Sequence, residues 1–221
     1  MGPVAERGVW LGPESGAAHR ADLAAFVERA MRLDAAAVIR LRARSDGLLA
    51  AWVATGFDVL ASRVVGGTAR PGDMSVAAGA LARGLSAMDA SGFVDPGFAM
   101  DSAWRGALPP ESGFAHLDDV PARVLLDLAD RGARLAREHS GSHGPPVSLL
   151  DQEVVRVSSA EGSVGLPMRC VFALTAMGFL PQPAEGADEV IRVRVAPAWL
   201  RLDARFGSVH RRRGGPALLV R

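Results

Sequence analysis

LPMRCVFALTAMGFL, residues 166–180, is an almost entirely apolar stretch broken only by Arg169 and Thr175. Pro167 suits the first turn of a helix, and Pro181 suits the position just after its end. A helix that is apolar on nearly all sides belongs in a protein interior. Fifteen residues are too few to cross a bilayer, and an arginine is costly in lipid. The stretch therefore predicts a buried helix around which the core is built, and no membrane association.

The composition is that of a folded chain. The 221 residues are 49% hydrophobic and 22% charged, which is enough to bury one large core or two smaller ones. All 25 basic side chains are arginine, and lysine, asparagine and tyrosine are absent. These absences indicate a GC-rich bacterial genome. The arginine excess therefore does not by itself imply a nucleic-acid partner.

No cofactor or bound metal is expected. The single cysteine, Cys170, excludes an internal disulfide and a cysteine-based zinc site, and its apolar setting predicts a buried, unreactive thiol. His139 and His143 flank Gly141, and this spacing could hold a shared metal only on a helix. The five histidines are expected in loops or at the ends of elements. The N-terminal residues contain no secretory signal, so a soluble cytoplasmic protein is expected.

The first half of the chain predicts helices and antiparallel strands. Apolar spacing indicates, in order, a helix over 21–33, strands over 37–44, 48–55 and 57–65, and a helix over 74–88 with Asp73 as its N-cap. Gly66 and Gly67 precede the second helix, but their surroundings match neither of the common phosphate-binding fingerprints. We interpret this glycine-rich segment as a connection.

The second half predicts a comparable set of elements. An irregular segment over 89–117 is followed by a helix over 118–138 capped by Asp118 and Asp119, a strand over 147–158, the buried helix, and a hairpin of strands 190–195 and 199–206. The irregular segment is rich in glycine and proline, which is typical of a surface crossing. We therefore expect two lobes, an N-terminal lobe over 1–117 and a C-terminal lobe over 118–221.

The two lobes share an order of features. Val38-Ile-Arg-Leu-Arg42 follows a helix, as does Val190-Ile-Arg-Val-Arg194, and a tryptophan and a phenylalanine come after each motif. An old internal duplication explains this order, and so does coincidence between two arginine-rich strands. The predicted fold class is α+β, with two packed lobes that each combine helices with an antiparallel sheet.

Positive charge gathers at the C-terminal end. Residues 191–221 hold eight arginines against one acid, Asp203, a balance of +7; the whole chain is +1, which leaves −6 for residues 1–190. Alternation along the hairpin places arginines on one face, with Phe206 on the opposite, apolar face. The predicted contacts with nucleic acid or another polyanion are Arg192, Arg194, Arg201, Arg205, Arg211, Arg212 and Arg213.

Three classes of function fit these patterns. A non-enzymatic protein that binds a polyanion through the hairpin is favoured, because the chain carries no motif of a known catalytic class. The hairpin arginines fit equally well a solvated sheet face or a contact with a second copy, so a protein-interaction or homodimerisation module is the alternative. A third class is a ligand-binding or enzymatic protein with a pocket between the lobes, for which Gly66-Gly67 and Arg105 are the only hints.

Overall fold

The protein folds into two compact units. In the computed structural model, the described residues are 7–12, 16–139, 146–160, 162–181 and 189–214. Unit 1 comprises Met1–Gly56 and Ser62–Ala107, and unit 2 comprises Phe57–Ala61 and Leu108–Arg221. The short segment Phe57–Ala61 therefore belongs to unit 2, although its neighbours in the chain on both sides belong to unit 1.

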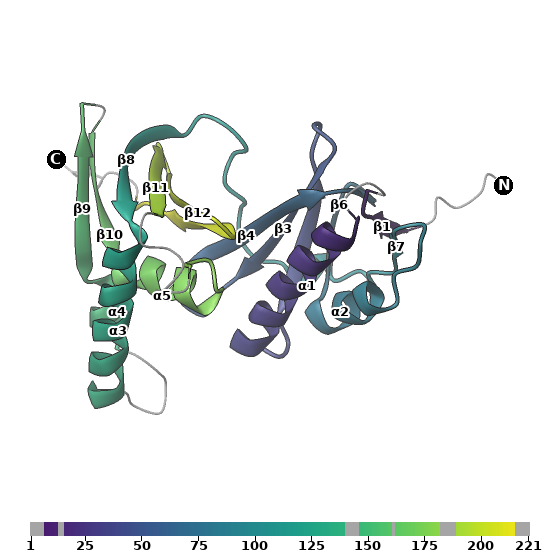
Figure 1. The fold of residues 1–221 in the computed structure, drawn as a ribbon, viewed down its shortest axis with the longest axis horizontal. Helices are drawn as coiled ribbons and strands as arrows, with labels where there is room; N and C mark the ends of the chain where they lie inside the picture. The colour runs from purple at the N-terminus through teal and green to yellow at the C-terminus, as the bar shows by residue number, and fades with distance from the viewer. Residues whose placement is uncertain (1–6, 13–15, 140–145, 161, 182–188, 215–221) are drawn as a thin grey trace. The chain divides into compact units, whose positions relative to one another are not determined.

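Unit 1 combines helices with two groups of paired strands (Figure 1). Its elements are β1 (Gly8–Trp10), α1 (Gly16–Leu33), β2 (Val38–Ala43), β3 (Leu48–Ala54), β4 (Leu60–Gly66), β5 (Thr68–Arg70), β6 (Asp73–Ala77), α2 (Ala78–Ser86), β7 (Phe93–Val94) and the short 3-10 helix η1 (Asp101–Ala103). The strands are ordered β6-β2-β3-β4 and β5-β1-β7. Helices α1 and α2 lie side by side.

Alternation along the strands sets the two faces of the unit 1 sheet. Ile39 and Leu41 of β2 pair with Val53 and Ala51 of β3, and all four side chains are buried. Arg40, between them, points to the other face. The core of unit 1 lies on the apolar face, where α1 and α2 also bury their apolar residues.

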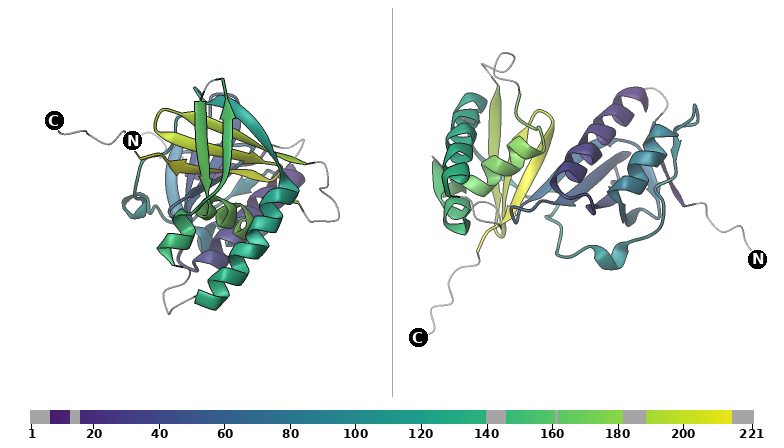
Figure 2. Two further views of the ribbon diagram at one scale, coloured as in Figure 1. Left: turned by 90° about the vertical axis from the view of Figure 1, so that its left-hand side faces the viewer. Right: turned by 90° about the horizontal axis from the view of Figure 1, so that it is seen from below.

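Unit 2 uses the same kinds of element. They are β8 (Ala115–Pro121), α3 (Ala122–His139), α4 (Val147–Asp151), β9 (Glu153–Ser159), β10 (Gly162–Pro167), α5 (Met168–Ala176), β11 (Val190–Ala196), β12 (Trp199–Ala204) and β13 (Gly207–Arg212). The strands follow the order β13-β12-β11-β8, while β9 and β10 form a separate antiparallel hairpin. Helices α3 and α5 lie side by side (Figure 2). Among the described residues, no helix is long and apolar enough to cross a membrane.

The predicted buried helix is confirmed as α5, although it is shorter than expected. Residues 166–167 end β10 instead, and the helix stops where Gly178 takes a φ of +65°. The amide of Gly178 donates to Thr175 O and the amide of Phe179 donates to Leu174 O, both at 2.9 Å. This pair of bonds is a Schellman motif, which needs a residue that tolerates a left-handed backbone. The glycine, and not the later proline, is therefore the stop signal.

Only the second part of the helix expected over 74–88 is helical, as α2. The first part belongs to strand β6, whose apolar residues are buried against β2. Asp73 is not a helix cap, because its carboxylate accepts two hydrogen bonds of 2.7 Å from Arg40. These bonds lower the pKa of Asp73 below its ordinary value.

Two further predictions have wrong boundaries. Asp118 and Asp119 lie inside β8, where they pair with residues of β11, so α3 begins only after Pro121. The acidic pair resembled a helix cap, but Leu117 and Val120, the apolar residues on either side of it, are both buried in the strand, and a register shift in the pairing next to Leu117 accommodates their spacing of three. Residues 147–151 form α4, and the strand expected over 147–158 starts at Glu153.

The two units share a layout that is consistent with an old internal duplication. In unit 1, β1 and β6 precede α1 and α2; in unit 2, β8 and β10 precede α3 and α5. The two similar motifs noted in the sequence occupy β2 and β11, and each of these strands pairs antiparallel with the strand that follows it. The predicted α+β class, with helix-plus-sheet lobes, is confirmed.

The core role of α5 can be tested with two substitutions in adjacent residues. Leu174 is 0% exposed, and Leu174→Asp should prevent soluble folding, because an unpaired carboxylate in an apolar core costs several kcal/mol. Thr175→Asp is the matched control, since Thr175 is exposed and the change should cost about 1 kcal/mol or less. Thermal melting of the purified proteins measures both effects. A Leu174→Asp variant that melts cooperatively near the wild-type temperature would contradict the assignment.

Candidate polyanion interface

The hairpin of β11 and β12 carries three of the predicted arginines on one face. Arg194 pairs directly with Arg201, and Arg192 lies two residues before Arg194 on the same strand. The opposite face is apolar, since Val193 and Leu202 between them are fully buried. Alternation along the sequence therefore located this face of the sheet.

Arg205 and Phe206 lie in the turn after β12, so neither belongs to a strand face. Arg205 is exposed and forms an ion pair of 2.7 Å with Glu189, while its guanidinium lies 5.3 Å from the centre of the Phe206 ring. Phe206 is partly exposed, in contrast to the expected place on the apolar face. Gly207 then begins β13, a third strand that the sequence reasoning did not identify.

Strand β13 separates the last three arginines. Arg212 pairs with Trp199 and shares the face of Arg201, but Arg211 pairs with Leu200 and lies on the opposite face. There, Arg211 Nη2 approaches Asp151 Oδ1 at 3.4 Å. Arg213 follows the strand and donates a hydrogen bond of 3.3 Å to the carbonyl oxygen of Ala196. The seven arginines therefore do not form one continuous strip.

Asp203 neutralises the centre of the arginine face. Its carboxylate lies 3.1 Å from Arg194 Nε and 2.6 Å from Arg201 Nε, and it also accepts a hydrogen bond from Ser208. The side chain of Asp203 is only 15% exposed, so water screens these pairs weakly. The guanidinium groups of Arg194 and Arg201 are thus already engaged by an acid of the same hairpin.

Only some of the seven predicted arginines remain available for contact with a partner. Within the described part of the chain, no carboxylate lies within ion-pair distance of Arg192, Arg212 or Arg213. Arg192 nevertheless sits between Asp119 and Asp203 in the strand register. The assignment of all seven arginines to polyanion binding stays a prediction, and the ion pairs favour Arg192, Arg212 and Arg213 within it.

A buried histidine lies beside this face. His210 pairs with Arg201 across β12 and β13, and the ring of Phe114 meets it edge-on at 6.2 Å. The Arg201 guanidinium also lies 5.6 Å from the centre of the Phe114 ring. Burial, reinforced by the nearby Arg201 charge, lowers the pKa of His210 to about 3. The expectation that every histidine lies in a loop or at an element end is wrong for this residue.

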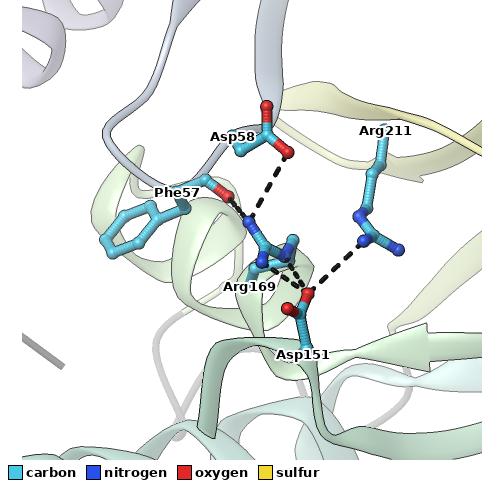
Figure 3. Close-up of polar contacts among 5 residues, drawn as sticks. All are labelled: Phe57, Asp58, Asp151, Arg169 and Arg211. Carbon is cyan, nitrogen blue, oxygen red and sulfur yellow. Dashed lines mark hydrogen bonds and ion pairs between the residues drawn. The ribbon is translucent and has the colours of Figure 1, made fainter. Parts of the chain in front are cut away.

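The one arginine of the buried helix forms a second polar centre in unit 2 (Figure 3). Arg169, at the start of α5, donates from Nε and Nη2 to Asp151 Oδ1 and from Nη1 to the carbonyl oxygen of Phe57 at 2.7 Å. Asp58 lies 3.7 Å from the same Nη1, with its own side chain 89% exposed. Arg211 approaches Asp151 from β13.

Sequence reasoning identified Arg169 but none of its partners. A lone arginine in an apolar helix signals that some acid or carbonyl group must meet it, because a buried charge without a partner is very costly. The signal does not say which group, since Phe57 and Asp151 are remote in sequence. The ring of Phe57 also packs against Phe172, with 6.0 Å between centroids, which holds the Phe57–Ala61 segment on α5.

Two observations concern metal binding and thiol chemistry. Among them, no group of three or more histidine, cysteine, aspartate and glutamate side chains is arranged to hold a metal ion. Burial raises the pKa of the Cys170 thiol to about 12, so this cysteine is not a thiolate nucleophile at neutral pH. His139 lies at the end of α3, and His143 lies outside the described residues.

Two protein-family models together match nearly the whole chain. Residues 5–106 match a family described as Domain of unknown function (DUF8010), and residues 109–216 match one described as Domain of unknown function (DUF8185). No curated protein matches the sequence. The two matches meet close to the division between the units.

Solved structures with a similar fold include three bacterial proteins. "Caulobacter crescentus pol III beta" has 14% identity and a TM-score of 0.54, over 96% of this chain and 67% of that one. A putative DNA polymerase III β subunit from Eubacterium rectale has 10% identity and a TM-score of 0.57, with 97% and 67% covered. The DNA polymerase III β subunit from Pseudomonas aeruginosa has 12% identity and a TM-score of 0.57, with 96% and 66% covered. At these low identities the TM-scores show a shared fold alone, and the chain spans about two thirds of the length of these structures.

The buried His210 predicts an acid-sensitive stability. Its pKa in the folded protein, about 3, lies below the value of about 6.5 for an exposed histidine. The unfolded chain therefore binds the extra proton first, and folding stability should fall as pH decreases from 6.5 towards 3, by up to roughly 1.4 kcal/mol per pH unit. Urea unfolding of the wild type and of His210→Gln across this range measures the effect. Equal pH slopes for the two proteins would contradict it.

The Arg169 centre predicts unequal effects for its two acidic partners. Asp151→Asn should destabilise unit 2 by about 3 kcal/mol or more, because it leaves a buried guanidinium without its carboxylate. Asp58→Asn should change stability by less than about 1 kcal/mol, because that carboxylate is largely in water. Chemical unfolding of the full chain compares the two variants. The quantity compared is the free energy of the transition that includes unit 2. A similar cost for both would show that Asp151 is not the principal partner.

Proposed function

We propose that this protein is a non-enzymatic, DNA-associated binding protein. The observation that carries the proposal is the fold: almost the whole chain follows the fold of structures named as DNA polymerase III β subunits and, for another Caulobacter crescentus structure, as a DNA polymerase sliding clamp. Two properties of the described side chains add support. They include no cluster arranged to hold a metal ion, and the thiol of Cys170 is buried and protonated. Binding of DNA, and not a reaction on it, is the role proposed for this chain.

The proposed contact surface is the arginine face of the unit 2 sheet and the end of β13. Arg192 and Arg212 share that face, and Arg213 extends it beyond the strand. The other predicted arginines already meet acids of the same unit: Arg194 and Arg201 meet Asp203, Arg205 meets Glu189, and Arg211 meets Asp151. We therefore expect about three phosphate contacts from this surface and not seven.

The ion pairs also favour a second candidate, a protein-interaction module. An array of alternating arginines and acids on a sheet face is suited to stay solvated or to meet another protein through matched charges. In that case the arginine face contributes to stability or to association with a protein, and DNA retention does not depend on it.

Salt-dependent DNA binding distinguishes the two candidates. If the three available arginines contact phosphates, the logarithm of affinity should fall with the logarithm of salt concentration with a slope of about −3, since each contact releases about one counterion. Arg192→Ala/Arg212→Ala should reduce the slope by about two. Arg205→Ala is the control, because its guanidinium already meets Glu189, and it should change the slope by less than one.

The measurement is a fluorescence-anisotropy titration with single-stranded and double-stranded DNA at several salt concentrations. Affinity should vary little with base sequence, because phosphates carry no sequence information. Binding that survives the double substitution with an unchanged slope would assign the contact to another surface. No binding of either DNA form at low salt would refute the proposal and leave the protein-interaction module.

A further inference from the structure

Three strands of unit 1 carry an aromatic pair on their outer face. Strand β1 pairs antiparallel with both β5 and β7, and Val9 and Val94 point together into the core, where both are fully buried. Trp10 and Phe93, which pair with each other across β1 and β7 (Figure 1), therefore lie on the opposite face. Their ring centres are 5.5 Å apart, with the planes inclined at 55°. Both residues are partly exposed.

Gly8 leaves the space that these two rings occupy. It lies two residues before Trp10 and therefore shares its face of the sheet. A Cβ atom added to Gly8 would overlap Cε2 of Phe93 and lie 3.1 Å from Cη2 of Trp10. A glycine inside a strand often marks such a close approach to the backbone. Both rings thus lie against the sheet, where they form an ordered apolar surface.

An arginine lies beside the aromatic pair on the same face. Arg70 of β5 pairs directly with Gly8, and its guanidinium lies 5.8 Å from the centre of the Trp10 ring. Arg70 is exposed, and among the described residues no carboxylate lies within ion-pair distance of it. Its N–H groups therefore remain available to an anion that reaches the rings.

The neighbouring charges leave a positive balance around this patch of Trp10, Phe93 and Arg70. Arg7, which precedes β1, donates to an uncharged group, the carbonyl oxygen of Gly97, at 2.6 Å. One acid follows β7: Asp95, whose carboxylate accepts a hydrogen bond of 2.9 Å from the amide of Gly97. The acid that begins β6 is already bonded to an arginine of β2. The two arginines outweigh the single carboxylate, so the patch favours an anionic ligand.

The aromatic pair and the arginine together suit a flat ring that carries a phosphate. Aromatic side chains stack on nucleobases of any sequence, and positive side chains beside them meet the backbone. Inside a duplex each base is stacked between its neighbours, and exposing one costs energy. We propose that the patch binds single-stranded DNA, with a base packed on Trp10 and Phe93 and a neighbouring phosphate at Arg70. The proposal rests on the proposed association with DNA, but it adds a second surface, in unit 1, that prefers unpaired bases.

Stacking and phosphate contacts leave different signatures in an anisotropy titration of the full chain with a labelled dT oligonucleotide. Trp10→Leu should weaken binding by about tenfold or more, which is typical for the loss of one stacked base. It should not change the salt slope, because no phosphate contact is lost. Arg70→Ala should flatten the slope by roughly 0.7, the value for one phosphate of a single strand. Trp10→Leu should leave the affinity for double-stranded DNA unchanged.

Trp104 supplies a matched control for the loss of a tryptophan. The guanidinium of Arg40 lies 5.8 Å from the centre of its ring, the same distance as in the pair of Arg70 and Trp10. The carboxylate of Asp73, however, already accepts two hydrogen bonds from Arg40. Trp104→Leu should therefore leave both the affinity for the single strand and its salt slope unchanged.

An abasic strand of the same length tests the proposal without any change to the protein. It keeps the phosphates and lacks the bases, so the wild type should bind it about tenfold or more weakly than the intact strand. This difference should narrow for Trp10→Leu. Thermal melting of each variant shows whether it is folded, and the result with the wild type holds even if Trp10→Leu is not.

Two outcomes would overturn the proposal. They are equal affinity of the wild type for the intact and abasic strands, and single-strand binding that a folded Trp10→Leu variant leaves unchanged. Trp10 and Phe93 would then be a cross-strand pair that only stabilises the sheet. Neither outcome touches the salt-dependent binding assigned to Arg192 and Arg212, so a failure here is distinct from a failure of the proposed function.

Discussion

The structure of unit 2 depends on one charged side chain in an otherwise apolar helix. Arg169 opens the buried helix α5, and only 7% of this residue is exposed. Such a guanidinium is tolerated only if its donors are satisfied, and here Asp151 and the carbonyl oxygen of Phe57 satisfy them. The centre therefore brings together the end of α4, the start of α5 and a segment from the first half of the sequence. Apolar packing is non-directional, whereas these hydrogen bonds specify which segments meet.

Those parts of the fold that depend on periodicity could be predicted from the sequence. The run around Leu174 predicted a buried helix because no face of it suits water, and the alternation around Ile39 and Ile191 predicted paired strands. Prediction failed where two local signals competed. Asp73 and Asp118 resemble helix caps, but each lies in a strand, and Asp73 pairs with Arg40 of a neighbouring strand. Local propensity cannot anticipate such tertiary contacts.

The candidate interface shows the same limit in its electrostatics. A sequence yields the number of arginines at the C-terminal end, and alternation places Arg192, Arg194 and Arg201 on one face. It does not reveal that Asp203 lies between two of them, or that Arg211 turns to the opposite face. The field that a partner meets is set by these pairings, so the +7 balance of the segment overstates the positive charge that a phosphate would find.

The placement of Phe57–Ala61 has a consequence for how this chain could evolve. The two family matches divide the sequence once, between residues 106 and 109. The chain, however, passes from one compact unit to the other at three points. A gene fragment that encodes only the second half would lack the carbonyl group of Phe57 and the ring that packs on Phe172. Recombination at the apparent domain boundary would thus separate a core from one of its own parts. Selection for the stability of unit 2 therefore favours inheriting the two halves together, even though each half resembles a module.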